Sequence, residues 1–319
     1  MKTLAISRLL DSKRDSLALE LLNEGADLER RIVDPSVSSP GLVLAGFTRR
    51  FPSGRLQVLG ETEISFLRSL EPADLERTVR QFLDLDVPAL VVTKGQTVPD
   101  VLLQAATTRG VPLIRTRLKT GDFFRRVQPF LTDHFAPSTT VHGSLADVYG
   151  VGLLFVGRSG IGKSECVLDL VERGHRLVAD DLVYATRRGH DVLIGRGHEM
   201  QGHHMEIRGI GIIDIKALFG IRAIRQQKRI EVVVQLVDWN EQGGYDRTGL
   251  DNETTELLDV SLPRVSVPLN PGKNITVISE VVAMNHLLKY SGVNSAELFN
   301  RRLQDAMRPV RDYLEEDYE

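Results

Sequence analysis

The sequence predicts an α/β protein with a small N-terminal α/β domain and a C-terminal domain built around a phosphate-binding loop. Its length, 319 residues, suits two ordinary domains better than one. Residues 87–118 show a strand, helix, strand pattern, and residues 157–164 read GRSGIGKS between an apolar run and a helical pattern. We expect the two domains to cover residues 1–131 and 132–319.

Local patterns define the N-terminal elements. Ser39 and Pro40 suit the N-cap and first position of a helix. Residues 73–85 carry apolar side chains at helical spacing, and residues 87–118 predict a βαβ unit. Because no cluster in this half looks catalytic, we interpret it as a structural or assembly domain.

A helix over residues 123–135 precedes residues 136–140 (APSTT), which we interpret as the linker. Beyond it, glycine is frequent and short apolar strands alternate with turns. Residues 280–292 and 294–307 predict two amphipathic helices that serve packing or partner binding.

Composition excludes several classes of protein. The chain is 42% hydrophobic and 26% charged, with a formal net charge of −3, so neither a nucleic-acid partner nor a membrane anchor is indicated. No stretch matches a signal peptide or a membrane helix. The single cysteine, Cys166, excludes an intrachain disulfide, so we expect a cytoplasmic protein.

The segment GRSGIGKS matches the pattern G-x-x-x-x-G-K-[ST] in the strand–loop–helix order that a P-loop requires. Glycines let backbone N–H groups approach phosphate, and the following helix adds its positive end. Lys163 places a cation on the phosphates and Ser164 offers a hydroxyl to Mg²⁺. The predicted nucleotide-binding residues are Gly157, Arg158, Ser159, Gly160, Ile161, Gly162, Lys163 and Ser164.

A P-loop site also needs an acid for the metal. Asp180 and Asp181 end an apolar run that we expect to form a strand beside the P-loop strand, and Asp238 is the rival. If Asp180 and Asp181 continue that strand, their side chains point to opposite faces of the sheet. One then serves the metal side and the other faces an acceptor, where a kinase needs a base for a hydroxyl. Alternatively, both are solvated acids at a strand end.

Several further residues have a functional and a plain interpretation. His198 and His203 are spaced poorly for zinc, whereas Glu206 precedes a glycine-interrupted strand and suits a second Mg²⁺ ligand. His142 precedes the P-loop strand and is either catalytic or structural. Arg247 either stabilises charge on a transferred phosphoryl group or lies on the surface. The loop at residues 267–275 binds an anion or is a plain turn.

Six motifs in order, VHGSLADVYG, GRSGIGKSE, LVADDLV, MEIRGIGIIDI, YDRTG and VPLNPGKN, resemble the HPr kinase/phosphorylase family. The resemblance extends through PGLVLAGF and RLQVLGETE to the N-terminal half. It implies a cytoplasmic bifunctional enzyme that phosphorylates a serine of the phosphocarrier protein HPr with ATP or pyrophosphate. It also implies removal of that phosphate by phosphorolysis, with inorganic phosphate as acceptor and pyrophosphate as product. The family assembles as a hexamer and uses Mg²⁺ or another divalent cation.

Residue roles follow from the resemblance by motif. Ser164 and Glu206 hold the metal, and Asp181 is the base for the seryl hydroxyl and the proton donor in reverse. Asp180 is then either an acid on the metal side or one that supports a metal ligand. His142, Lys163 and Arg247 support catalysis. The resemblance ties one further group to both reactions: Met205, Ile207, Arg208 and Gly209. It ties a second group chiefly to dephosphorylation: Pro268, Asn270, Pro271, Gly272 and Lys273.

Two other functions stay open from the sequence. The first is a P-loop kinase that acts on a small molecule. The second is a regulator that binds ATP without transferring phosphate. The second acid beside the expected metal acid argues against the regulator, since simple nucleotide binding needs no base for an acceptor.

Overall fold

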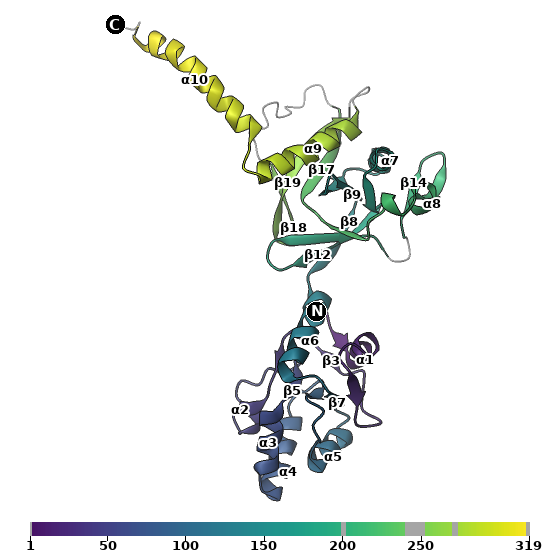
Figure 1. The fold of residues 1–319 in the computed structure, drawn as a ribbon, viewed down its shortest axis with the longest axis vertical. Helices are drawn as coiled ribbons and strands as arrows, with labels where there is room; N and C mark the ends of the chain where they lie inside the picture. Colours follow the sequence, from purple (N-terminus) through teal and green to yellow (C-terminus); the bar gives the residue numbers. More distant parts are fainter. Residues whose placement is uncertain (1, 199–201, 240–252, 270–273, 317–319) are drawn as a thin grey trace. The chain divides into compact units, whose positions relative to one another are not determined.

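The protein forms two compact units, Met1–Ala136 and Pro137–Glu319, in a computed structural model. It describes residues 2–198, 202–239, 253–269 and 274–316, the stretch 308–316 by its backbone alone. Figure 1 traces the chain from the purple N-terminus to the yellow C-terminus.

The N-terminal unit contains a five-stranded sheet of order β2-β7-β6-β5-β4. β4 to β7 run parallel and β2 is antiparallel at the edge, so the predicted βαβ unit, β6-α5-β7, is confirmed. The strands are β1 (Leu4–Ala5), β2 (Leu19–Leu21), β3 (Arg31–Ile32), β4 (Val37–Ser38), β5 (Leu56–Leu59), β6 (Leu90–Val92) and β7 (Leu113–Thr116).

Helices cover both faces of this sheet because its side chains alternate between two cores. In β6, Val91 packs with α1 and α6, while Leu90 and Val92 pack with α3, α4 and α5. The helices are α1 (Ile6–Lys13), α2 (Gly41–Leu44), α3 (Glu61–Ser69), α4 (Pro72–Leu83), α5 (Asp100–Thr108) and α6 (Thr120–Phe135).

The helix expected at Ser39 differs from the prediction. Pro40 is its N-cap residue rather than its first helical residue, and the helix, α2, has four residues. The expected linker is wrong for most of its length. Residues from Ser138 onward pair in a sheet as β8, and their alternating exposure is that of an edge strand.

The C-terminal unit has two main sheets, of order β11-β9-β10-β17-β19-β18 and β16-β13-β12-β8, and a small hairpin, β14-β15. The strands are β8 (Ser138–His142), β9 (Ser144–Val148), β10 (Val151–Val156), β11 (Arg176–Ala179), β12 (Leu182–Arg188), β13 (Val192–Arg196), β14 (His204–Ile207), β15 (Gly211–Asp214), β16 (Gln227–Arg229), β17 (Val232–Asp238), β18 (Thr254–Leu257) and β19 (Val260–Leu269).

The six-stranded sheet separates two hydrophobic cores. On β10, Leu153 and Phe155 face the core shared with the helices, and Leu154 faces the four-stranded sheet. α9 packs against β10, β17 and β19 (Figure 1). The helices are α7 (Lys163–Glu172), α8 (Ile215–Phe219), the 3₁₀ turn Ile221–Ala223, α9 (Ile275–Tyr290) and α10 (Ser295–Glu316).

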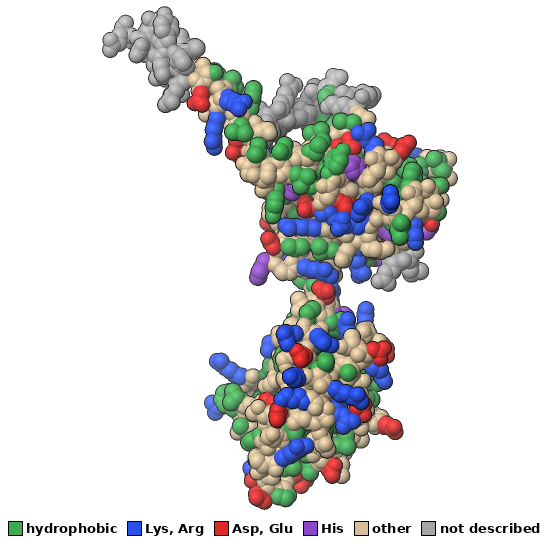
Figure 2. All heavy atoms as spheres, in the orientation of Figure 1, with side chains coloured by type: hydrophobic (Ala, Val, Ile, Leu, Met, Phe, Trp, Pro, Cys, Tyr) green, Lys and Arg blue, Asp and Glu red, His purple; other side chains and the backbone are tan. Residues whose placement is uncertain are grey.

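Two helices form where the sequence predicts them, α9 and α10, and both expose apolar side chains. The prediction was wrong in part for α9, which begins at Ile275 and is not amphipathic, because apolar side chains also occupy its exposed face. Figure 2 shows hydrophobic side chains gathered over α9, which include Val281 and Leu288. Phe299 on α10 is 68% exposed. Among the described residues, no helix combines the length and apolarity needed to span a membrane.

Candidate active site

The predicted phosphate-binding loop connects β10 to α7 through residues 157–162. Its backbone has a φ of 150° at Gly157 and 73° at Gly160, a region that L-residues with a Cβ rarely adopt. A Cβ on Gly157 would also lie 2.7 Å from the carbonyl oxygen of Leu236. The loop therefore depends on glycine for its turn and for its close contact with β17.

The first turn of α7 is open to an anion. Its N-cap residue is Gly162, which has no side chain to accept hydrogen bonds from the first N–H groups of the helix. Those groups and the positive end of the helix favour a bound phosphate. Ile161 is buried and holds the loop on the hydrophobic core, whereas Ser159 is exposed.

Lys163 folds back over the loop. Its Nζ donates to the carbonyl oxygens of Gly157 at 3.2 Å and Arg158 at 3.0 Å. The Arg158 guanidinium forms a two-point ion pair with Asp238 at the end of β17, with N–O distances of 2.6 and 2.8 Å. The hydrogen bond from Arg158 lowers the pKa of Asp238. Asp238, the rival candidate for the metal ligand, is thus already paired with Arg158.

Asp180 is a buried carboxylate directly beside the P-loop serine. Its Oδ1 accepts hydrogen bonds from Ser144 Oγ at 2.5 Å and Ser164 Oγ at 3.1 Å. Burial raises the pKa of Asp180, and the two serine hydrogen bonds oppose that shift. A nearby cation would stabilise the charged form of a carboxylate buried in this way.

The residues fit a divalent metal at this point. Ser164 Oγ and Asp180 Oδ1 lie 3.1 Å apart, and both are the hard oxygen donors that Mg²⁺ prefers. Glu206, the other predicted ligand, is exposed on β14, and within the described residues no hydrogen bond or ion pair joins it to Ser164. The structure brings Asp180, rather than Glu206, to the P-loop hydroxyl.

Asp181 differs from Asp180 because the chain turns sharply between β11 and β12. Its φ is 63°, and the N–H of Leu182 donates to the carbonyl oxygen of Asp180 at 2.7 Å across the turn. The Asp181 side chain is 72% exposed, and its Oδ1 lies 3.9 Å from Nδ1 of His142. This strained turn presents one acid outward next to a histidine and leaves the other buried.

The expected strand neighbours were partly wrong. β11 does not lie beside β10, because β9 pairs between them. β17, which carries the rival acid Asp238, is the strand that lies beside β10 on its other side. His142 ends β8 and pairs with Leu182, so it approaches Asp181 across the second sheet rather than from the turn before β10.

In the β14-β15 hairpin, some of the predicted site residues pack in the core and others face the P-loop. Met205 and Ile207 are 1% and 6% exposed and anchor the hairpin in the core. The alternate residues, Glu206 and Arg208, are exposed. Arg208 reaches the P-loop, since a Cβ placed on Gly160 would lie 2.3 Å from its Nη2. Gly209 follows in the turn with a φ of 86°.

The remaining predicted residues are only partly described. Pro268 pairs with Val237 near the carboxyl end of β19. The P-loop leaves β10 at the same end of these parallel strands. Arg247 and the residues Asn270, Pro271, Gly272 and Lys273 lie outside the described residues.

Sequence reasoning missed Ser144, whose hydroxyl holds Asp180. The available signal is a serine at the start of the strand SLADV, because a fully buried serine needs a hydrogen-bond partner. It also missed the buried pair of His175 and Glu280, which join at 3.0 Å. These two residues are 105 apart in the chain, and no local pattern links them.

Comparisons with known proteins follow the same division of the chain. The family model described as "HPr Serine kinase N terminus" matches residues 4–131, and the "HPr Serine kinase C-terminal domain" matches residues 133–303. A protein of Prosthecochloris aestuarii named HPr kinase/phosphorylase is 47% identical over 98% of this chain and 94% of its own length. The protein of that name from Geobacter sulfurreducens is 44% identical over 98% and 99%. A solved Hpr(Ser) kinase/phosphatase from Coxiella burnetii is 32% identical with a TM-score of 0.45, and the match covers 50% of this chain and 98% of that one.

Proposed function

The chain belongs to the HPr kinase/phosphorylase family, and from that premise we propose that it phosphorylates a serine of HPr with ATP or pyrophosphate and reverses the step by phosphorolysis. One observation carries the assignment of roles. Asp180 is buried on the Ser164 hydroxyl, while Asp181 is exposed beside His142. The two acids therefore serve different partners.

Asp181 is the base in the forward direction. The seryl oxygen of HPr forms a bond to the terminal phosphorus of the donor, and the bond from that phosphorus to the bridging oxygen breaks. The seryl proton passes to the Asp181 carboxylate. His142, whose Nδ1 lies 3.9 Å from the Asp181 carboxylate, supports catalysis as its neighbour.

The reverse reaction uses the same acid. An oxygen of inorganic phosphate forms a bond to the phosphorus of phosphoserine, the bond to the seryl oxygen breaks, and Asp181 returns a proton to that oxygen. Pyrophosphate is the product. The same residue acts in both directions because the forward and reverse reactions pass through one transition state.

The phosphate groups bind along the P-loop. The N–H groups of the loop and of the first turn of α7 hold their oxygens. The Lys163 ammonium exchanges the carbonyl oxygens of Gly157 and Arg158 for phosphate oxygens. Arg208, next to Gly160, adds a second cation.

Ser164 and Asp180 would hold Mg²⁺, with Glu206 approaching from the hairpin. When bound, the ion neutralises charge on the transferring phosphoryl group. Ser144 fixes the Asp180 carboxylate in place. Arg247 and the segment from Pro268 to Lys273 keep their proposed roles in catalysis and dephosphorylation, and a cytoplasmic homohexamer remains part of the proposal.

The test uses the full chain with purified HPr, ATP and MgCl₂. We expect phosphoserine on HPr by mass spectrometry. Subsequent addition of inorganic phosphate should remove it and yield one pyrophosphate per phosphoserine lost. Absence of phosphoserine would refute the kinase assignment. Loss of phosphoserine without pyrophosphate would refute phosphorolysis.

A further inference from the structure

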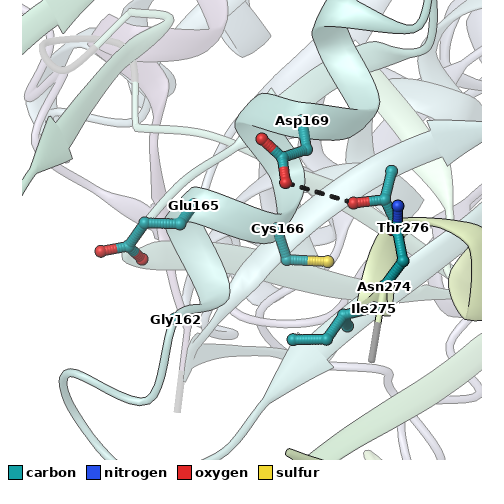
Figure 3. A pocket seen from close by; sticks show the side chains of 7 residues that line it. All are labelled: Gly162, Glu165, Cys166, Asp169, Asn274, Ile275 and Thr276. Atoms are coloured by element: carbon teal, nitrogen blue, oxygen red, sulfur yellow. Dashed lines mark hydrogen bonds between the residues drawn. The ribbon is translucent and has the colours of Figure 1, made fainter. Parts of the chain in front are cut away.

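A pocket of about 400 Å³ lies between the start of α7 and the start of α9 (Figure 3). This volume lies within the range of small-molecule sites, about 300–1,000 Å³. Gly162 belongs both to the P-loop and to the pocket wall, so the pocket adjoins the phosphate site. The lining residues are Gly162, Glu165, Cys166, Asp169, Asn274, Ile275 and Thr276.

The pocket lies where α7, which packs on β9 and β11, meets the start of α9, which packs on β9, β10, β17 and β19. In the sheet, β9 and β11 lie on one side of β10, and β11 leads into Asp180 and Asp181. β17 and β19 lie on the other side, run parallel to β10, and precede the start of α9. Ligands of open α/β sheets bind at the carboxyl ends of such strands. A donor whose terminal phosphate faces Asp181 thus extends toward this pocket.

The rim of the pocket suits hydrogen-bond donors rather than phosphate. Glu165 and Asp169 lie one turn apart on α7 with exposed side chains. Among the described residues that line the pocket, none is Lys or Arg. The two carboxylates repel a phosphate chain. They accept hydrogen bonds from an amine or a hydroxyl.

The floor of the pocket is buried and uncharged. Cys166 and Thr276 are each 3% exposed. Burial raises the pKa of Cys166 to about 12, so its thiol is neutral and soft, a favourable contact for an aromatic ring. The Thr276 hydroxyl donates to Asp169 Oδ2 at 3.3 Å, which fixes that carboxylate (Figure 3). An apolar floor below two acceptors matches a base and a ribose.

We propose that this pocket binds the nucleoside of ATP, with Asp169 and Glu165 accepting hydrogen bonds from its amine or hydroxyl groups. The inference rests on the proposed kinase function and extends it to donor choice. Pyrophosphate has no nucleoside, so it occupies the P-loop alone. The pocket therefore determines how well the enzyme uses ATP and has no part in the use of pyrophosphate.

The two donors provide the test. Asp169→Asn and, separately, Glu165→Gln remove one charged acceptor each while keeping side-chain shape. We expect at least one variant to raise KM for ATP about tenfold, as loss of a charged hydrogen bond implies. KM for pyrophosphate should stay within twofold of wild type. Glu172→Gln, an exposed site at the end of the same helix, is the matched control and should change neither value.

Activity with pyrophosphate also reports that each variant is folded. Equal changes in KM for both donors in both variants, or unchanged KM for ATP in both, would overturn the pocket assignment. Failure of the proposed function is a different result: the wild-type chain would then transfer phosphate to HPr from neither donor.

Discussion

Asp180 and Asp181 are neighbours with different surroundings because a tight turn separates their side chains. The sequence predicted the difference from strand alternation, yet β11 ends at Ala179 and neither acid is in a strand. The turn gives Asp181 a φ of 63°, which Asp tolerates better than most residues with a Cβ. The different surroundings of the two acids were thus predictable from the sequence, but the turn that causes them was not.

Ser144 should act as a positioning residue for Asp180. Ser144→Ala removes a buried hydrogen bond to that carboxylate, so we expect about a 10- to 100-fold loss in activity or metal affinity, as for other residues that orient metal ligands. The measurement is the Mg²⁺ concentration that gives half-maximal HPr phosphorylation. It should rise in the variant, and Ser144→Thr should restore it.

Ser261→Ala, an exposed serine on β19, is the control. An unchanged Mg²⁺ requirement in Ser144→Ala would show that Ser144 contributes packing alone.

At the scale of elements, the P-loop helix is joined to α9 by a buried ionic group. Glu280 on α9 accepts from Arg173 at 2.7 and 2.8 Å and joins His175 at 3.0 Å. The hydrogen bond from Arg173 holds the pKa of Glu280 below its ordinary value; burial opposes this shift, and the hydrogen bond with His175 adds to it. This contact holds α9, and with it the pocket wall at Thr276, against α7.

Glu280→Gln should lower the free energy of unfolding at pH 7 by about 1–3 kcal/mol, because a charged hydrogen-bond network is lost. The direction in which this stabilisation changes with pH follows from the lowered pKa of Glu280. The stabilisation is fully present above 4.5, the ordinary pKa of a glutamate, and is lost as pH falls through the lower pKa of the folded protein. Urea unfolding at several pH values should therefore show the difference from wild type shrinking in acid.

The exposed Glu172→Gln serves as the control for that experiment. A difference between Glu280→Gln and wild type that stays constant from pH 7 to pH 3 would contradict an ionic contribution.

The strand order was the element-level feature that the sequence did not reveal. β9 and β10 form a hairpin whose two loop residues, Tyr149 and Gly150, have φ values of 51° and 83°. Positive φ at both positions is typical of a type I′ turn, which Asn-Gly signals far more strongly than Tyr-Gly. Because this turn was missed, β9 was not expected between β10 and β11. The P-loop itself was predictable because its glycines, lysine and serine are fixed by local chemistry.

At the scale of the whole molecule, the two units have separate hydrophobic cores and should unfold separately. Phe123 is fully buried in the N-terminal unit, so Phe123→Ala should cost about 3–5 kcal/mol there. Scanning calorimetry should show one transition moving down by more than about 10 °C and the other unchanged. Added ATP should raise the unchanged transition, since ligand stabilises the unit that binds it.

If both transitions move together in Phe123→Ala, the units do not unfold independently.

The change in glycine content and strand pattern beyond residue 140 made two units predictable. The expected linker was mostly wrong because Ser138–His142 pairs with β12, a strand more than 40 residues later, and local composition carries no sign of that pairing.

One acid, Asp181, should handle the proton in both directions. The most direct measurement compares Asp181→Asn with wild type in HPr phosphorylation and in phosphorolysis, alongside ATP binding. We predict a loss of about 10²- to 10⁴-fold in both directions with ATP affinity within twofold, and no effect of the exposed control Asp191→Asn. Near-normal activity in either direction would show that Asp181 is not the shared base and acid.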